Sequence, residues 1–209
     1  PDPDASLSAV KKPDYDYPMR FGSEPLTQDA EPPKRKVIDV ARESLALMCE
    51  ALATLGDSHA VYGFSGQGHD HVEFYVAKEF EDRLDARCWT AMGAMKEQLF
   101  TRMGPAIRHA LSKLARQSAC LKVLIVVSDG YPQDLDYGPD RMDDEYGIQD
   151  TARALREAEE QSVQTFCITI DPTGHDYLRR MCQENRYMVI DEVQDLPNEL
   201  TKVYRALTV

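Results

Sequence analysis

The fold of this 209-residue chain is decided by the stretch Leu121-Lys122-Val123-Leu124-Ile125-Val126-Val127. A nearly continuous β-branched run predicts a strand that is buried on both faces, as in a parallel sheet. A second strongly apolar strand is predicted at 163–170, and a short last strand at 187–190. Segments with helical spacing of apolar residues separate these strands, which favours a parallel sheet with helices on both faces.

The same patterns predict the elements on either side of this strand. Residues 60–64 form a short apolar strand, and residues 71–76 alternate as a strand nearer an edge does. Helices are predicted where apolar residues recur every three to four positions. They cover residues 37–52 (with Gly56 as the stop), 85–98, 105–114, 148–160, 175–182 and 195–207. The fold class is therefore α/β.

Residues 1–36 differ in composition from residues 37–209. They hold seven of the chain's 12 prolines, and so dense a set prevents a regular helix and predicts a long surface loop. We expect this segment to contain one polar motif, described below, and residues 37–209 to form the remainder of a single domain.

Composition excludes several classes of function. Acidic residues number 36 and basic residues 24, so the net charge is −12 and a nucleic-acid partner is not expected. No run of about 18 apolar residues is present, which argues against insertion into a membrane. The five cysteines show no Cys-x-x-Cys pair, which is typical of reduced, mostly buried thiols and predicts a cytoplasmic location.

Three groups of polar residues fall where the predicted sheet would bind a ligand, outside the carboxyl ends of its strands. They are Asp4-Ala5-Ser6-Leu7-Ser8, then Thr101 just before a helix, and Asp129 after the strand that ends at Val127. Hydroxyl and carboxylate oxygens suit a hard divalent cation such as Mg²⁺. Each fragment alone is equally typical of a helix cap or a turn; the ordered combination is more specific.

That combination resembles the metal-ion-dependent adhesion site of von Willebrand factor type A domains, a family with a Rossmann-like fold. The flanking sequence is similar to one subgroup, the C-terminal domain of the NorD and CbbO proteins. The similar stretches are 56–65, 101–109, 128–136, 146–151 and 196–207. The resemblance covers about residues 37–209 together with Asp4 to Ser8.

The resemblance implies a binding role rather than catalysis. Such domains are similar to adaptors that work with a hexameric MoxR-type AAA+ ATPase to activate a client metalloenzyme, nitric oxide reductase or Rubisco. It implies that Ser6, Ser8 and Thr101 bind the metal directly, and that Asp4 and Asp129 act mainly through water. The open coordination position of the bound metal would then bind an acidic residue of the partner.

The sequence departs from this family before Asp4. The family's buried first strand leads straight into the motif, whereas only Pro1-Asp2-Pro3 stand here, and two prolines argue against a central strand. Either the chain is a fragment cut at this point or the Asp4 motif is misassigned. If the motif is misassigned, Ser6 and Ser8 are not part of the metal site. The loop at 66–71 also lacks the arginine that the family usually carries there.

Other interpretations remain open. The fold also suits a magnesium or cobalt chelatase subunit, and Asp4 or Asp129 would suit a metal-dependent phosphohydrolase. The acidic loop provides a possible calcium set of Asp134, Asp136, Asp140, Asp143 and Asp144, although its spacing is not that of an EF-hand. His69 and His71 are expected at the surface rather than on zinc.

Three further side chains are expected to have structural roles. We expect His109 to support the fold, and Arg102 and Arg108 to hold the acidic loop. If those ion pairs are exposed, each contributes only about 0–1 kcal/mol.

Overall fold

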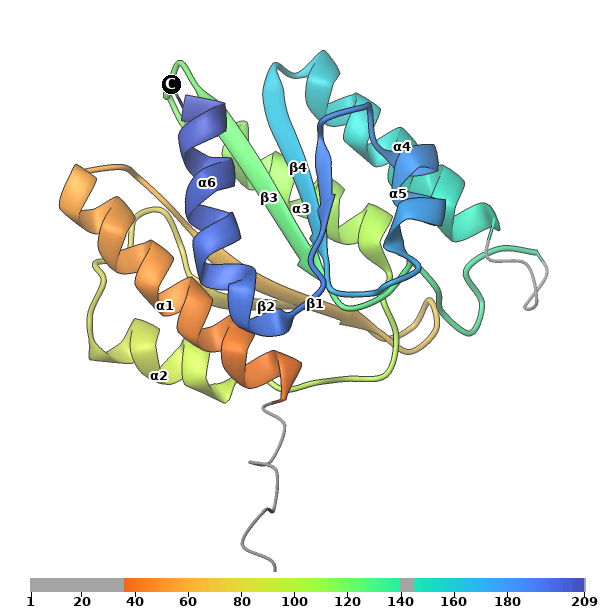
Figure 1. Ribbon diagram of the computed structural model, residues 1–209, viewed down its shortest axis with the longest axis horizontal. Coiled ribbons are helices and arrows are strands. Elements are labelled where there is room, and N and C mark those ends of the chain that lie inside the picture. The colour runs from red at the N-terminus through yellow and green to blue at the C-terminus, as the bar shows by residue number, and fades with distance from the viewer. Residues whose placement is uncertain (1–35, 140–144, 209) are drawn as a thin grey trace, which may run out of the picture. The chain divides into compact units, whose positions relative to one another are not determined.

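Helices and strands alternate along the computed structural model, which describes residues 36–139 and 145–208 (Figure 1). The helices are α1 Val37–Leu55, α2 Ala86–Ala94, α3 Met103–Leu114, α4 Glu145–Glu160, α5 Gly174–Met181 and α6 Leu196–Thr208, with the 3-10 turn η1 Val193–Asp195 before α6. The strands are β1 Val61–Gly66, β2 Val72–Lys78, β3 Lys122–Ser128, β4 Val163–Thr169 and β5 Tyr187–Val189. All eleven predicted elements are present, so the α/β prediction is confirmed.

The described strands form two separate sheets rather than one. The first contains β3, β4 and β5 in that order, all parallel, with Val126 opposite Cys167 and Cys167 opposite Tyr187. The second is the antiparallel pair β1 and β2, in which Phe64 faces Phe74. Among the described strands β2 pairs with β1 alone, and its first five residues are exposed or half-buried.

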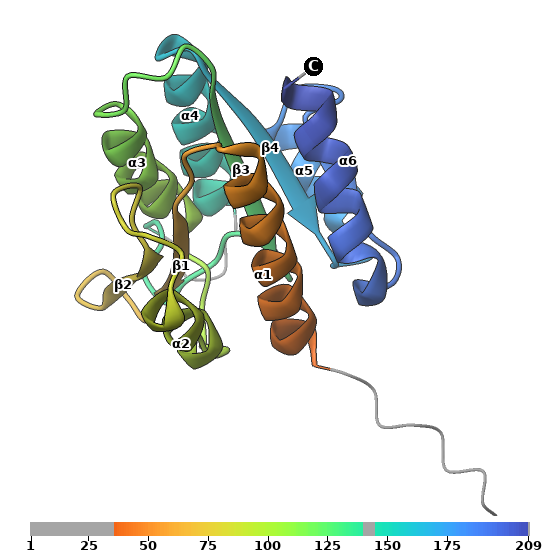
Figure 2. The ribbon, with the colours of Figure 1, turned by 90° about the vertical axis from the view of Figure 1, so that its left-hand side faces the viewer.

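Helices cover both faces of the parallel sheet, as Figure 2 shows for α3 and α4 on one side of β3 and α1 and α6 on the other. The first face packs against one apolar cluster. Its buried members include Met103, Ile107, Leu111, Val126, Ile148, Leu155, Val163, Cys167 and Leu178. The second face packs Phe166 and Ile168 against Leu196, Leu200 and Val203 of α6. A third cluster joins α1 and α2 to β1 and β2.

The ends of two helices follow from local chemistry. α1 ends at Gly56, which has φ +81° and whose neighbour Asp57 donates its N–H to the Leu52 carbonyl 2.9 Å away. A residue without Cβ adopts this left-handed conformation at little cost, so the predicted stop is confirmed. α3 begins at Met103 rather than at Pro105. Pro105 still lies in the first turn, where a missing N–H breaks no helical hydrogen bond.

The burial expected of β3 is wrong for most of the strand. Only Val126 is buried, with 6% of its surface exposed, and the other six residues are half-buried. By contrast, β4 buries every residue except Gln164. Among the described strands, β3 has a paired neighbour on one side only, whereas β4 lies between β3 and β5, which accounts for the difference.

Residues 1–35, with Asp4, Ser6 and Ser8 among them, lie outside the described residues. Within the described part of the chain, no helix is long and apolar enough to cross a membrane.

Candidate functional site

The two predicted metal ligands that the structure describes line one cavity. Thr101 precedes α3 and Asp129 follows β3, and both line a cavity of about 530 Å³ together with Ser65 and Ser128. Thr101 is half-buried, whereas Asp129 is exposed. Residues 28 positions apart in the sequence therefore line the same cavity, beside the carboxyl end of β3.

Within the part of the chain that the structure describes, nothing occupies the side-chain oxygens of these two residues. Among the described residues, neither the Thr101 hydroxyl nor the Asp129 carboxylate makes a hydrogen bond or an ion pair with another. The neighbouring Ser128 hydroxyl is occupied, because it donates to the Gly130 carbonyl at 2.8 Å. A hydroxyl beside a carboxylate is a donor set that fits a hard divalent cation.

Carboxylate, thiol and imidazole groups alone do not build a metal site in this part of the chain. No group of three or more His, Cys, Asp or Glu side chains within residues 36–139 and 145–208 could hold an ion. A site at Thr101 and Asp129 therefore needs hydroxyl ligands or residues outside the described ranges. Asp4, Ser6 and Ser8 lie outside the described ranges, so their role as metal ligands stays a prediction.

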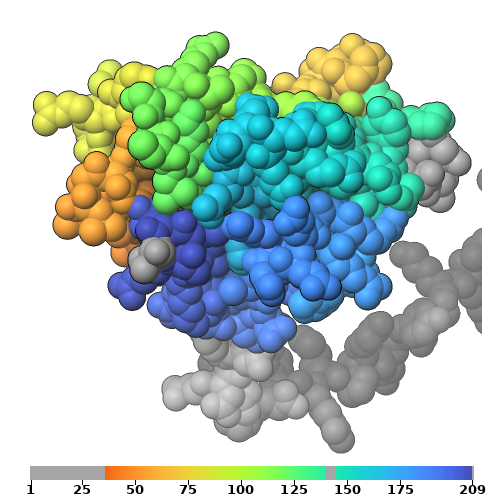
Figure 3. All heavy atoms as spheres, turned by 90° about the horizontal axis from the view of Figure 1, so that it is seen from above, coloured from red at the N-terminus to blue at the C-terminus, as the bar shows by residue number. Residues whose placement is uncertain are grey.

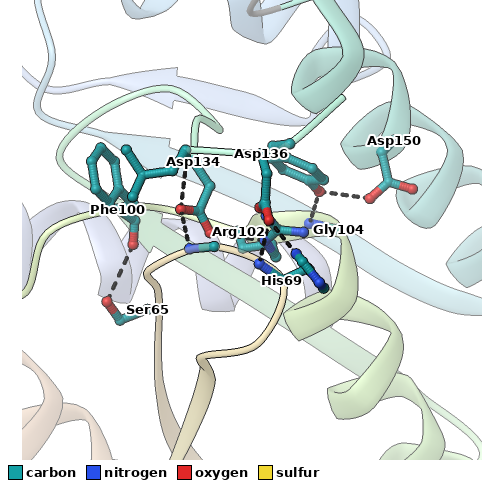
Figure 4. Close-up of polar contacts among 11 residues, drawn as sticks. Ser65, His69, Phe100, Arg102, Gly104, Asp134, Asp136 and Asp150 are labelled. Carbon is teal, nitrogen blue, oxygen red and sulfur yellow. Dashed lines mark hydrogen bonds and ion pairs between the residues drawn. The ribbon is translucent and has the colours of Figure 1, made fainter. Parts of the chain in front are cut away.

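The backbone around Thr101 is fixed from two sides. The Gly66 N–H donates to the Phe100 carbonyl at 3.0 Å, and the Ser65 hydroxyl donates to the same oxygen at 3.2 Å (Figure 4). On the other side, the Thr101 N–H donates to the Gln133 carbonyl at 2.9 Å. These bonds join the loop before α3 to β1 and to the loop after β3.

Arg102 is paired with the acidic loop, as predicted, and its ion pair with Asp134 is buried. Its Nε donates to Asp134 Oδ2 at 2.8 Å, and the two side chains are only 9% and 0% exposed. Its Nη2 contacts the half-buried Asp136, and its guanidinium carbon lies 4.7 Å from the centre of the Tyr137 ring.

Asp134 joins three segments of chain. Its Oδ1 accepts the N–H groups of Gly68 and Leu135, both at 2.7 Å. Burial acts to raise the pKa of Asp134, but the Gly68 amide and the Arg102 guanidinium outweigh it, so the pKa lies below its usual value. Because Asp134 and Asp136 are bound to Arg102, they do not form the calcium set considered above. Asp140, Asp143 and Asp144 lie outside the described residues.

Tyr137 extends this network to α3 and α4. Its hydroxyl donates to Asp150 Oδ2 at 2.6 Å and accepts the Gly104 N–H at 3.1 Å. Arg108 donates to Asp150 Oδ1 at 2.8 Å, so the predicted ion pair to the acidic segment is confirmed. A Cβ on Gly104 would lie 2.1 Å from Asp150 Oδ2, so only glycine fits there.

The sequence did not reveal Tyr137 or Gly104 as part of this network. The available signal was an aromatic residue within a strongly acidic loop, opposite a glycine in the first turn of a helix.

The histidines take structural positions among the described residues. The exposed His69 ring contacts the Asp136 carboxylate. This hydrogen bond raises the pKa of His69, and together with the His69 amide it lowers the pKa of Asp136 to about 2. The His109 ring packs edge-on against Phe74 with centroids 4.4 Å apart, which confirms a structural role.

Sequence comparisons link the chain to proteins of one family. The family model for the von Willebrand factor type A domain matches residues 42–206. The chain is 38% identical over 174 residues to an uncharacterized protein of Pseudomonas aeruginosa, covering 83% of this chain and 28% of that protein. It is 39% identical over 161 residues to protein NorD of Stutzerimonas stutzeri, covering 77% and 26%. It is 30% identical over 182 residues to protein NorD of Brucella melitensis, covering 87% and 28%. The chain thus spans a little over a quarter of the length of these relatives.

Solved structures share the fold at low sequence identity. Proximal thread matrix protein 1 from the mussel byssus superposes with a TM-score of 0.59 at 12% identity, covering 81% of this chain and 42% of that chain. A second structure of the same protein, with a zinc-occupied MIDAS motif, gives a TM-score of 0.57 at 13% identity over the same shares.

Proposed function

Because the chain belongs to the von Willebrand factor type A domain family, we propose that it is a metal-dependent protein-binding module and not an enzyme. One observation carries the proposal: Thr101 and Asp129 line the same cavity, and their oxygens are not used by the described part of the domain. A cation held there by few charged ligands stays electrophilic and attracts a carboxylate from another molecule.

The proposed metal set has five residues. Thr101, Ser6 and Ser8 bind the ion directly, and Asp129 and Asp4 hold it mainly through water. Mg²⁺ is the proposed ion, because it prefers oxygen ligands and retains several waters. The zinc-occupied MIDAS motif of the mussel protein supports a divalent cation in this fold.

The proposed partners are a MoxR-type AAA+ ATPase and a client metalloenzyme that presents an acidic residue, within the cytoplasm. Two of the relatives are named NorD, which supports an accessory role and a client similar to nitric oxide reductase. A Rubisco-like metalloenzyme is the alternative client within this proposal.

A magnesium titration of the full chain and three variants tests the metal site. Asp129→Ala and Thr101→Ala remove proposed ligands, whereas Glu160→Ala removes an exposed carboxylate at the end of α4, next to the amino end of β4. We expect Mg²⁺ at a hundredfold excess over its Kd to stabilise the wild type and Glu160→Ala by about 2.7 kcal/mol. The two ligand variants should show little of this gain. Equal gains in all four proteins would refute the site, and phosphoester turnover that is lost in Asp129→Ala would favour a hydrolase instead.

A further inference from the structure

Two of the chain's five free cysteines lie within hydrogen-bonding reach of each other. Cys167 lies in β4, between β3 and β5 in the parallel sheet, and Cys182 directly follows α5. Cys167 belongs to the apolar cluster on the first face of that sheet, and Cys182 packs against the same cluster. The Cys167 thiol donates a hydrogen bond to the Cys182 sulfur. A disulfide needs two side chains that point toward each other, and this contact provides that arrangement.

A short turn after α5 brings Cys182 back to β4. The Cys182 N–H donates to the Leu178 carbonyl at 2.7 Å, which ends the helix, and the Arg186 N–H donates to the Gln183 carbonyl at 3.1 Å. The Arg186 carbonyl then accepts the Cys167 N–H at 3.0 Å. The backbone therefore returns to Cys167 within four residues of Cys182, and these hydrogen bonds hold the two cysteines on neighbouring segments.

The two thiols differ in their access to solvent. Cys167 is 3% exposed, whereas Cys182 is half-buried and is followed by three exposed residues. Figure 3 shows this face of the domain, where α5 and the chain after it lie next to α4, and Gln183 Nε2 donates to Glu159 Oε2 of α4 at 2.9 Å. The hydrogen bond to Cys182 and burial both raise the pKa of the Cys167 thiol. A reagent in solution therefore reaches Cys182 first, and Cys167 reacts through it.

A second pair of cysteines lacks this access. Cys49 of α1 and Cys88 of α2 belong to the third apolar cluster and are only 2% and 5% exposed. The Cys88 thiol donates to the Arg83 carbonyl at 3.2 Å. Burial raises the pKa of Cys49 to about 11. Because thiolates are the reactive form and neither sulfur is at the surface, this pair should stay reduced in the folded chain and provides an internal reference.

We propose that Cys167 and Cys182 form a reversible disulfide in the folded domain when a small disulfide, such as oxidised glutathione, reaches Cys182. The two cysteines are 15 positions apart, so the cross-link closes a loop that runs from β4 through α5. It attaches the end of α5 to β4, in addition to the three residue pairs by which β5 contacts that strand. A cross-link of this kind restricts the freedom of the unfolded chain.

The reaction proceeds by two thiol–disulfide exchanges. In the first, the Cys182 thiolate attacks one sulfur of oxidised glutathione, breaks its S–S bond and releases one glutathione thiolate, which takes up a proton. In the second, Cys167 loses its proton and its thiolate attacks Cys182 Sγ, which breaks the mixed disulfide and releases the other glutathione as a thiol. The two protein thiols together lose two electrons and two protons, and the small disulfide gains both to give two thiols.

Peptide mapping of the full chain tests the proposal. The parent protein carries Cys120→Ser, because that exposed thiol would react on its own. Folded protein is treated with oxidised glutathione, its remaining thiols are alkylated in urea, and the tryptic peptides are identified by tandem mass spectrometry. Trypsin cuts after Arg179 and Arg180, which places the two cysteines on separate peptides. We expect a cross-link between Cys167 and Cys182 at least tenfold more abundant than that of any other cysteine pair, and its loss when dithiothreitol is added.

Two serine variants of that parent identify the thiol that reacts first. Cys182→Ser should leave Cys167 free and alkylated, whereas Cys88→Ser, whose hydroxyl can still donate to the Arg83 carbonyl, should retain the cross-link. Glutathione that stays on Cys182 while Cys167 remains free overturns the proposal, because the two thiols then do not combine. Oxidation of Cys49 and Cys88 at the same rate as the proposed pair also overturns it, because the reaction then follows unfolding of the chain rather than the contact between Cys167 and Cys182.

Discussion

Removing the carboxylate of Asp134 should destabilise the domain strongly. Asp134→Ala leaves the guanidinium of Arg102, whose side chain is 9% exposed, without its buried partner, and it also leaves two backbone N–H groups without an acceptor. Removing one member of a buried ion pair typically costs about 3–5 kcal/mol. At 2–4 °C per kcal/mol for a domain of this size, the Tm should fall by roughly 6–20 °C.

Thermal unfolding followed by circular dichroism measures this effect, with Asp136→Ala as the matched control. Asp136 contacts the same guanidinium, but its side chain is 37% exposed, so its removal should lower the Tm far less. A double-mutant cycle with Arg102→Met then isolates the pairwise energy, because the cation is gone in two of its corners. A fall of less than about 2 °C for Asp134→Ala, which is below 1 kcal/mol on the same scale, would refute the reasoning.

Two other perturbations follow from contacts of the same network. Gly104→Ala places a methyl group against Asp150 and should cost about 1–3 kcal/mol in urea unfolding, whereas Gly93→Ala in α2 has open space and should gain about 0.5–1 kcal/mol; equal effects would contradict the close approach. NMR titration should give His69 a pKa above 6.5 in the wild type and a lower one in Asp136→Asn. Because the folded pKa of His69 is raised, its contact stabilises the domain fully below about pH 6.5 and is lost as the pH rises through the folded value. The pKa of Asp136 is lowered to about 2, so its contribution is present above about pH 4 and is lost as the pH falls towards 2. An unchanged titration of His69 in Asp136→Asn would contradict the pairing.

The order and type of the elements could be predicted from the sequence because they depend on local periodicity. The apolar spacing in α1 and the β-branched run of β3 each need only a few neighbours along the chain to be recognised. The positive φ at Gly56 belongs to the same class, since a glycine after a periodic segment is a local signal.

The separation of the sheets and the burial of Arg102 could not be predicted in this way. Whether β3 has one neighbour or two depends on strands elsewhere in the chain, and its own composition predicted two. Arg102 and Asp134 are 32 residues apart, and neither residue type signals burial. At the candidate site, the topology of parallel strands favoured placing Asp129 at a sheet edge, and Thr101 and Asp129 line one cavity there. The hydrogen bonds that fix Thr101 could not be predicted, because they depend on loops with no regular pattern.

The fixed backbone at Thr101 bears on the ion selectivity of the proposed metal site. Hydrogen bonds to Gly66 and Gln133 hold the flanking peptide groups before any ion arrives, so coordination orders little additional chain and loses little entropy there. A site whose backbone is held in this way adjusts little to an ion that is smaller or larger than the one it fits. Discrimination between cations of similar charge then depends on ionic radius and on how many waters each ion keeps.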